Sequence, residues 1–119
     1  MSDDVLKIDY NELPVTDMDA AKTFYAKAFG WTFTDYGPGY ASFDNAGIDG
    51  GLRLEETAFP NGALIILKAE DILTAEGRVK EAGSTIIHRE NFPGGRRFHF
   101  KDPSGNELAV WSPNGEYEL

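Results

Sequence analysis

The stretch Phe100-Lys101-Asp102-Pro103-Ser104-Gly105 decides the fold, because a related stretch, Phe43-Asp44-Asn45-Ala46-Gly47, takes the same place in the first half of the chain. Both lead from a phenylalanine through an acidic residue to a glycine, and both interrupt runs of strand-forming residues. A tight turn at each place would close the last hairpin of each half. The chain is therefore predicted to repeat one structural unit.

Working outward from these turns, apolar periodicity predicts the order strand, helix, strand, strand, strand in both halves. The first half contains strands at Leu6–Val15, Trp31–Tyr36, Tyr40–Asp44 and Gly50–Glu55, and a helix that begins after a capping box at Thr16 and ends at Gly30. The second half contains strands at Gly62–Lys68, Ser84–Arg89, Arg96–Lys101 and Glu107–Ser112, and a helix at Asp71–Ala82. The segment Thr57–Asn61, which carries Pro60, forms the seam between the halves.

We therefore predict an α+β fold of tandem βαβββ modules, residues 1–58 and 59–119, within a single domain of 119 residues. The modules would form two sheets around a cavity, with the helices on the outer faces.

Composition narrows the classes of function. Twenty acidic residues against eleven basic ones give a net charge of −9, which argues against nucleic acid or an anionic membrane as a partner. The chain has no cysteine, so it has neither a disulfide framework nor a thiolate nucleophile, and a cytoplasmic location fits this. The longest apolar run, Ala63–Leu67, is too short to span a membrane.

Several motifs together resemble the vicinal oxygen chelate superfamily, which includes glyoxalase I, extradiol dioxygenases, and fosfomycin- and bleomycin-resistance proteins. The motifs are Leu13-Pro14-Val15-Thr16-Asp17-Met18, Phe24-Tyr25, Phe29-Gly30-Trp31 and Phe100-Lys101-Asp102-Pro103-Ser104-Gly105-Asn106. The resemblance covers nearly the whole chain and implies the tandem-module fold. It also implies a divalent metal held by four inward-facing residues, mostly histidine and glutamate, one from the first and one from the last strand of each module.

In this chain the four corresponding positions are Tyr10, Gly51, Ala63 and Ala109, and none of them is a histidine or a carboxylate. A divalent ion needs imidazole or carboxylate donors at about 2.0 to 2.2 Å. We therefore expect that the metal site is lost and that the chain uses no cofactor. The resemblance then points to the metal-free bleomycin-resistance type, a homodimer that sequesters a small molecule.

Side-chain alternation along the strands predicts which residues line the cavity. Tyr10, Ile65 and Trp111 would form its apolar walls, and polar groups would come from Glu12, Arg53, Arg97, His99 and Glu107. Such a lining suits an aromatic ligand that carries an acid or a hydroxyl group.

His99 and Glu107 leave an enzymatic alternative open, because an imidazole beside a carboxylate can act as a general base. The chain would then be a lyase, isomerase or dioxygenase-type enzyme, working through this pair or through a displaced metal on Glu12, His99 and Glu107. A further alternative is a structural or partner-binding subunit with a filled interior. His88 is expected to face solvent.

Overall fold

The computed structural model describes residues 5–56 and 62–119, and its elements follow the predicted order. The first half contains β1 (Ile8–Val15), α1 (Met18–Phe29), β2 (Phe33–Asp35), β3 (Tyr40–Phe43) and β4 (Gly50–Leu54). The second half contains β5 (Leu64–Lys68), α2 (Ile72–Glu81), β6 (Ile86–Phe92), β7 (Gly95–Lys101) and β8 (Glu107–Ser112). The predicted seam at Thr57–Asn61, and with it the boundary between residues 58 and 59, lies outside the described residues.

The chain divides into two compact units that follow the repeat closely. We call Tyr10–Leu64 the first unit, and Ile65–Leu119 with the N-terminal segment through Asp9 the second unit. One contact between Asp9 and the rest of the second unit is the hydrogen bond that Trp111 Nε1 donates to Asp9 Oδ2 over 3.0 Å. No helix in residues 5–56 and 62–119 has the length and apolar character needed to cross a membrane.

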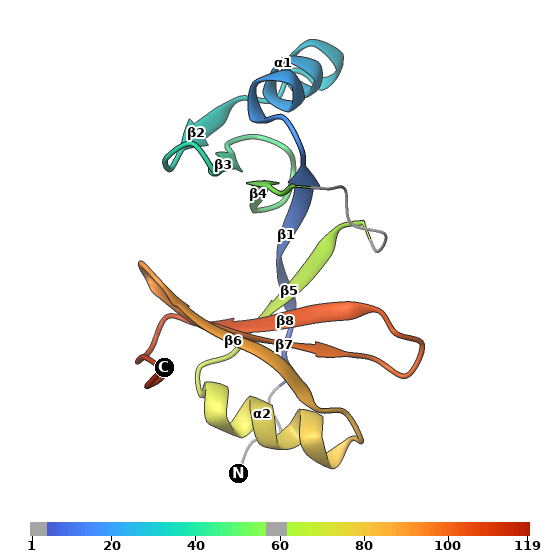
Figure 1. Cartoon of the computed structure of the whole chain (residues 1–119), viewed down its shortest axis with the longest axis vertical. Coiled ribbons are helices and arrows are strands. Elements are labelled where there is room, and N and C mark those ends of the chain that lie inside the picture. Colours follow the sequence, from blue (N-terminus) through green and yellow to red (C-terminus); the bar gives the residue numbers. More distant parts are fainter. Residues whose placement is uncertain (1–4, 57–61) are drawn as a thin grey trace. The chain divides into compact units, whose positions relative to one another are not determined.

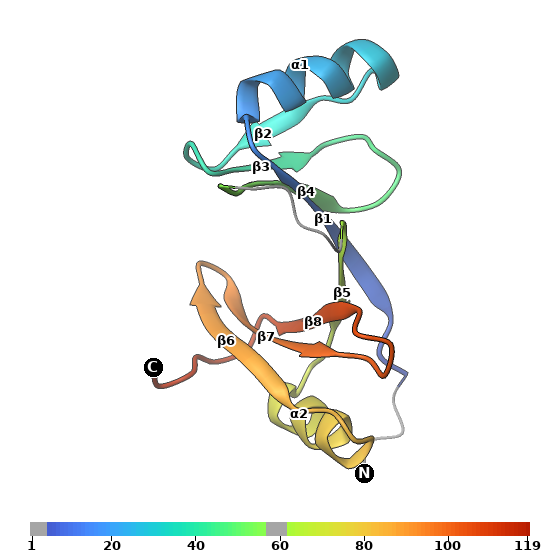
Figure 2. The same cartoon turned by 45° about the vertical axis from the view of Figure 1, so that its right-hand side comes forward.

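The first unit is a four-stranded sheet in the order β2-β3-β4-β1. Its β2–β3 and β3–β4 pairs are antiparallel, whereas β1 runs parallel to β4, as a strand separated from its neighbour by a helix can do. Figures 1 and 2 show α1 beside these strands, and Figure 2 shows it lying over one face of them. The sheet and its single helix confirm the predicted α+β module.

The cap at the start of α1 corrects the sequence analysis. The helix is capped by Asp17 and not by Thr16, because Asp17 has an extended backbone and its carboxylate accepts a hydrogen bond from the Ala20 backbone N–H at 2.9 Å. A charged acceptor at this position also interacts favourably with the helix dipole. The predicted end is confirmed: Gly30 closes the helix at φ 77°, which glycine adopts without strain.

Aromatic rings hold α1 on its sheet. Tyr25 stacks on Trp31 with ring centroids 4.9 Å apart, and Trp31 lies 5.0 Å from Phe43 of β3. None of the helix residues Met18–Phe29, all of which the structure describes, is buried. Phe24 and Phe29 are 59% and 62% exposed, so part of the apolar face of α1 is left in solvent.

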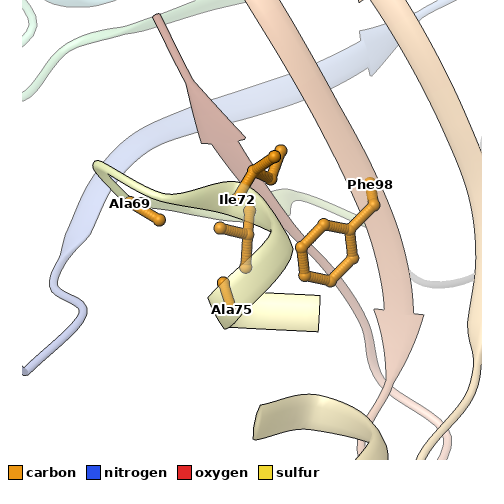
Figure 3. Close-up of a cluster of buried hydrophobic side chains, with 5 residues drawn as sticks. Ala69, Ile72, Ala75 and Phe98 are labelled. Atoms are coloured by element: carbon orange, nitrogen blue, oxygen red, sulfur yellow. The ribbon is translucent and has the colours of Figure 1, made fainter. Parts of the chain in front are cut away.

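The second unit repeats the arrangement with the strand order β5-β8-β7-β6. The pair β5–β8 is parallel, and the pairs β7–β8 and β6–β7 are antiparallel. Its core forms between α2 and the sheet, where Ile72 and Ala75 of the helix meet Phe98 of β7 (Figure 3). Val110 joins this core and Phe100 packs against it, which confirms that these side chains of β7 and β8 point toward the helix.

The C-terminal segment is tied to the second unit by contacts that the sequence did not predict. The Tyr117 hydroxyl donates a hydrogen bond to the buried Glu76 of α2, and Arg89 of β6 donates two hydrogen bonds to the same carboxylate, at 2.8 and 3.0 Å. Arg96 lies 4.9 Å from the Tyr117 ring and donates to the carbonyl of Asn114. Arg96 thus has a structural role.

Candidate functional site

A pair of tyrosine side chains fills the space at Tyr10 and Gly51, the two first-module positions where the superfamily implies metal ligands. The Tyr10 hydroxyl lies 2.8 Å from the hydroxyl of Tyr40, a residue of β3. Tyr40 also covers Gly51: a Cβ added to Gly51 would lie 2.6 Å from the Tyr40 hydroxyl oxygen and 2.7 Å from the carbonyl oxygen of Ala41. Position 51 therefore has no room for a ligating side chain while Tyr40 keeps this place.

Tyr40 extends this pair into a polar network. Its hydroxyl donates a hydrogen bond of 2.9 Å to Glu12, whose side chain is only 5% exposed. Arg53 lies 3.4 Å from Glu12 and 2.7 Å from Glu55. Burial, followed by the charge of Glu12 and the hydrogen bond with Tyr10, raises the pKa of Tyr40 well above its ordinary range. Tyr40 is therefore a hydrogen-bond donor at neutral pH and not a phenolate.

The pKa of Tyr10 is also raised, chiefly by burial. Since Tyr40 donates its proton to Glu12, Tyr10 donates to Tyr40, and the protons point in one direction along the network, from Tyr10 through Tyr40 to Glu12. The sequence analysis missed Tyr40, because its contacts with Tyr10 and Glu12 come from a strand 28 to 30 residues away in the chain.

The second-module positions offer no metal ligands either. Ala63 precedes β5 and is exposed, whereas Ala109 is fully buried in β8 and pairs with His99 of β7. Within the part of the chain that the structure describes, no group of three or more histidine and acidic side chains could hold a metal ion. The residues at the four positions therefore do not fit the metal that the superfamily implies.

The structure brings His99 and Glu107 together, as a pocket pair requires. His99 Nδ1 lies 2.8 Å from Glu107 Oε2, and the His99 residue is 4% exposed. Burial lowers the pKa of His99, and nearby Arg97 acts in the same direction, while the hydrogen bond that His99 donates to Glu107 opposes them. His99 is therefore neutral at pH 7, with its proton on Nδ1.

Glu90 joins this group, although the sequence analysis did not select it. One of its carboxylate oxygens lies 3.2 Å from Arg97 Nε, and the other lies 2.8 Å from His88 Nε2. Burial alone would raise the pKa of Glu90, but Arg97 and His88 lower it below its usual value. His88 is half exposed, as expected, yet its ring lies 5.3 Å from that of His99. The strand β6 runs on to Phe92, past the predicted end at Arg89, and therefore supplies Glu90 as well as His88.

Trp111 is half-buried at the predicted aromatic wall of the second module. Lys68 Nζ lies 5.4 Å from its ring centroid, and the Phe92 ring lies 6.1 Å away. Ile65 is in β5, opposite Leu108 of β8. The predicted residues thus fall into two groups: Tyr10, Glu12 and Arg53 in the first unit, and Ile65, Arg97, His99, Glu107 and Trp111 in the second. A shared cavity for both groups remains a prediction.

The second unit also has a pocket of about 890 Å³ between α2 and the sheet. Apolar side chains line most of it, including Leu67, Val79, Phe100 and Val110. The predicted ligand-binding residues do not line it, because the side chains of a strand alternate and this pocket lies on the helix side of the sheet. This pocket is therefore not the predicted site.

Comparison with known proteins agrees with this fold. Residues 7–110 match the Glyoxalase/Bleomycin resistance protein/Dioxygenase superfamily. No curated protein sequence matches the chain significantly. Among solved structures, a glyoxalase/bleomycin resistance protein/dioxygenase superfamily member from Vibrio splendidus 12B01 is similar, with a TM-score of 0.69 and 17% identity over 91% of this chain and 99% of its own.

Two further structures carry names with specific activities. Methylmalonyl-CoA epimerase from Mycobacterium tuberculosis has a TM-score of 0.71 and 14% identity, over 97% of this chain and 93% of its own. The Mn(II)-bound glyoxalase from Novosphingobium aromaticivorans has a TM-score of 0.67 and 23% identity, over 97% of this chain and 43% of its own. At these identities the likeness establishes the fold and no particular activity.

Proposed function

We propose that this chain, which belongs to the Glyoxalase/Bleomycin resistance protein/Dioxygenase superfamily, binds a small aromatic or acidic molecule without a metal ion. One observation carries this proposal: the Tyr40 hydroxyl takes the space beside Gly51 and hydrogen-bonds Tyr10, so two positions for metal ligands are built into a protein network. A protein of this fold that lacks the metal ligands can still enclose a small molecule in a cavity.

The second unit supplies the groups that such a ligand needs. Trp111 offers a partly exposed aromatic surface, and Arg97 and His99 are polar groups on the neighbouring strand β7. Planar aromatic ligands gain from stacking on a tryptophan ring, while a few fixed polar groups set their orientation.

The two tryptophans of the chain allow a local test of binding. The variant Trp31→Phe keeps one tryptophan, Trp111, at the proposed site. The variant Trp111→Phe keeps Trp31, which lies in the aromatic cluster with Tyr25 of α1 and Phe43. We expect aromatic acids and phenols to change the emission of Trp31→Phe and to leave that of Trp111→Phe unchanged, in EDTA as in its absence. Equal responses of both variants, or a response that needs added metal, would contradict the proposal.

We also propose that the chain forms a homodimer. The exposed rings of Phe24 and Phe29 on α1 support this, because apolar side chains clustered on one helix face often mark an association surface. Sedimentation equilibrium should give twice the chain mass of 13.1 kDa for the wild type. Phe24→Glu should shift the population toward monomer, whereas Lys27→Glu, on the same helix but polar already, should not. A wild type that is monomeric at all concentrations would contradict it.

A further inference from the structure

His99 stands on the face of its sheet that is turned away from α2. Its neighbours in the strand ladder, Phe98 and Val110, pack into the core against the helix. Because successive side chains of a strand point to opposite faces, His99 and its partner Ala109 lie on the other face. The imidazole is therefore buried among polar neighbours on this face, including Glu107 and the His88 ring, and not in the hydrophobic core.

Glu107 fixes the tautomer of this imidazole. A carboxylate accepts hydrogen bonds and does not donate them, so the 2.8 Å contact with His99 Nδ1 requires the proton to be on Nδ1. A neutral imidazole has only one N–H group, and Nε2 then carries a lone pair. His99 Nε2 is thus an acceptor of fixed orientation.

This acceptor is buried and has no hydrogen-bond partner among the residues that the structure describes. Leaving a buried polar atom unpaired costs free energy, and native proteins nearly always pair such atoms with protein, water or ligand. The atom belongs to a side chain that is 95% buried and already held by Glu107. Rearrangement of His99 would break that contact, so a partner for Nε2 has to come from another molecule, either a water or a ligand.

The charge of Arg97 beside His99 is matched within the second unit. Arg97 is paired with Glu90, and Glu90 also accepts from His88. A ligand at Nε2 therefore meets a neutral acceptor, and the Glu107 carboxylate lies at the other nitrogen of the same ring. Such an environment favours an uncharged O–H or N–H donor over a carboxylate, whose oxygens cannot donate to Nε2.

We infer that His99 Nε2 accepts a hydrogen bond from the hydroxyl group of a bound phenol. This inference rests on the proposed function and narrows it to one class of ligand. An aromatic alcohol suits the site because Trp111 comes two residues after Ala109 in β8, on the same face of the sheet as His99. Its ring can stack on the planar part of the ligand while His99 receives the hydroxyl.

Two compounds that differ only at the hydrogen-bonding group test this inference. 2-Naphthol has the hydroxyl donor and is un-ionised at pH 7, and 2-methoxynaphthalene has a methyl ether that cannot donate. By titration calorimetry, the wild type should bind 2-naphthol about tenfold more tightly than the ether. In His99→Phe the ratio should fall to about one, whereas His88→Phe, which removes the neighbouring imidazole nitrogens and their hydrogen bond to Glu90, should keep the preference.

The outcomes separate this inference from the proposed function. Equal binding of both compounds by the wild type would leave small-molecule binding intact and overturn the role of His99. Binding of neither compound, with Trp111 emission unchanged, would overturn both the phenol class and the site. If His99→Phe fails to fold, a measurement on the wild type without ligand tests the same point. Long-range ¹⁵N–¹H correlation NMR at pH 7.5 should find His99 with a proton on Nδ1 and none on Nε2. A proton on Nε2 would overturn the inference.

Discussion

The Tyr40 hydroxyl occupies the space that a side chain on Gly51 would need. A Cβ on residue 51 would lie 2.6 Å from the Tyr40 hydroxyl oxygen, closer than two such atoms can approach. The tyrosine side chain therefore depends on a glycine in the neighbouring strand, and Tyr40 lies two residues before Ser42, the partner of Gly51 in the β3–β4 pair. Through Tyr40 this relationship also fixes Tyr10 and Glu12. The polar network of the first unit is a consequence of one missing side chain.

Gly51→Ala should therefore destabilise the protein by about 1 to 3 kcal/mol, the range typical of overpacking a tight site. Part of this cost cannot be relieved by moving Tyr40, because the new methyl group would also lie 2.7 Å from the backbone oxygen of Ala41. Urea unfolding measures the change. The matched control is Gly77→Ala in α2, where no atom lies within 4 Å of the added Cβ and a gain of about 0.5 to 1 kcal/mol is expected.

Tyr40→Phe should cost about 1 to 3 kcal/mol for a different reason. The substitution keeps the ring but removes the donor to Glu12, whose carboxylate stays buried. Tyr36→Phe is the control, since Tyr36 is 65% exposed, and its free energy of unfolding should match that of the wild type. Equal free energies of unfolding for the two variants would mean that the Tyr40 hydroxyl does not stabilise the folded protein.

The lowered pKa of His99 predicts loss of stability in mild acid. Because the unfolded chain takes up a proton at histidine near pH 6.5 and the folded chain only at lower pH, the unfolded state binds more protons in this range. Stability should therefore fall as the pH drops below about 6.5. The carboxylates Glu76 and Glu90, whose pKa values are also lowered, act only below about pH 4.5.

Denaturant unfolding at a series of pH values between about 7 and 5 measures this dependence. The wild type should lose stability over this interval, and His99→Gln, which has no titrating group at this position, should show a flatter profile. Parallel profiles for the two proteins would show that burial does not disfavour the charged form of His99.

The C-terminal segment should contribute measurably to stability through Tyr117. Tyr117→Phe removes the hydroxyl that donates to the buried Glu76 and should lower the free energy of unfolding by about 1.5 to 3 kcal/mol, the range typical of a hydrogen bond to a charged group. Thermal unfolding compared with Tyr36→Phe detects it. If the two variants unfold at the same temperature, the hydrogen bond between Tyr117 and Glu76 does not stabilise the protein.

Much of the fold could be predicted because the signals are local and occur twice. The glycine-closed turns, the helix that ends at Gly30 and the alternation of Phe98 with His99 each follow from a short stretch of chain. The error at the start of α1 came from two adjacent residues that can both cap a helix, Thr16 and Asp17, and only the backbone conformation separates them.

The residues of the candidate site were harder to predict from the sequence than the fold. Alternation placed His99 and Glu107 on one face, and their contact follows from the pairing of β7 with β8. Tyr40 was missed because its partner Tyr10 lies 30 residues away in sequence, on a strand that is not its direct neighbour in the sheet. Only the three-dimensional sheet brings these side chains together.

Metal content tests the account most directly. The protein is to be purified with manganese, zinc, nickel and iron present in turn, passed through a desalting column and subjected to elemental analysis. We predict that no metal is retained in stoichiometric amount, and that Tyr40→Phe does not change this result. Retention of one divalent ion per chain, lost on substitution of His99 or Glu12, would contradict binding without a metal ion.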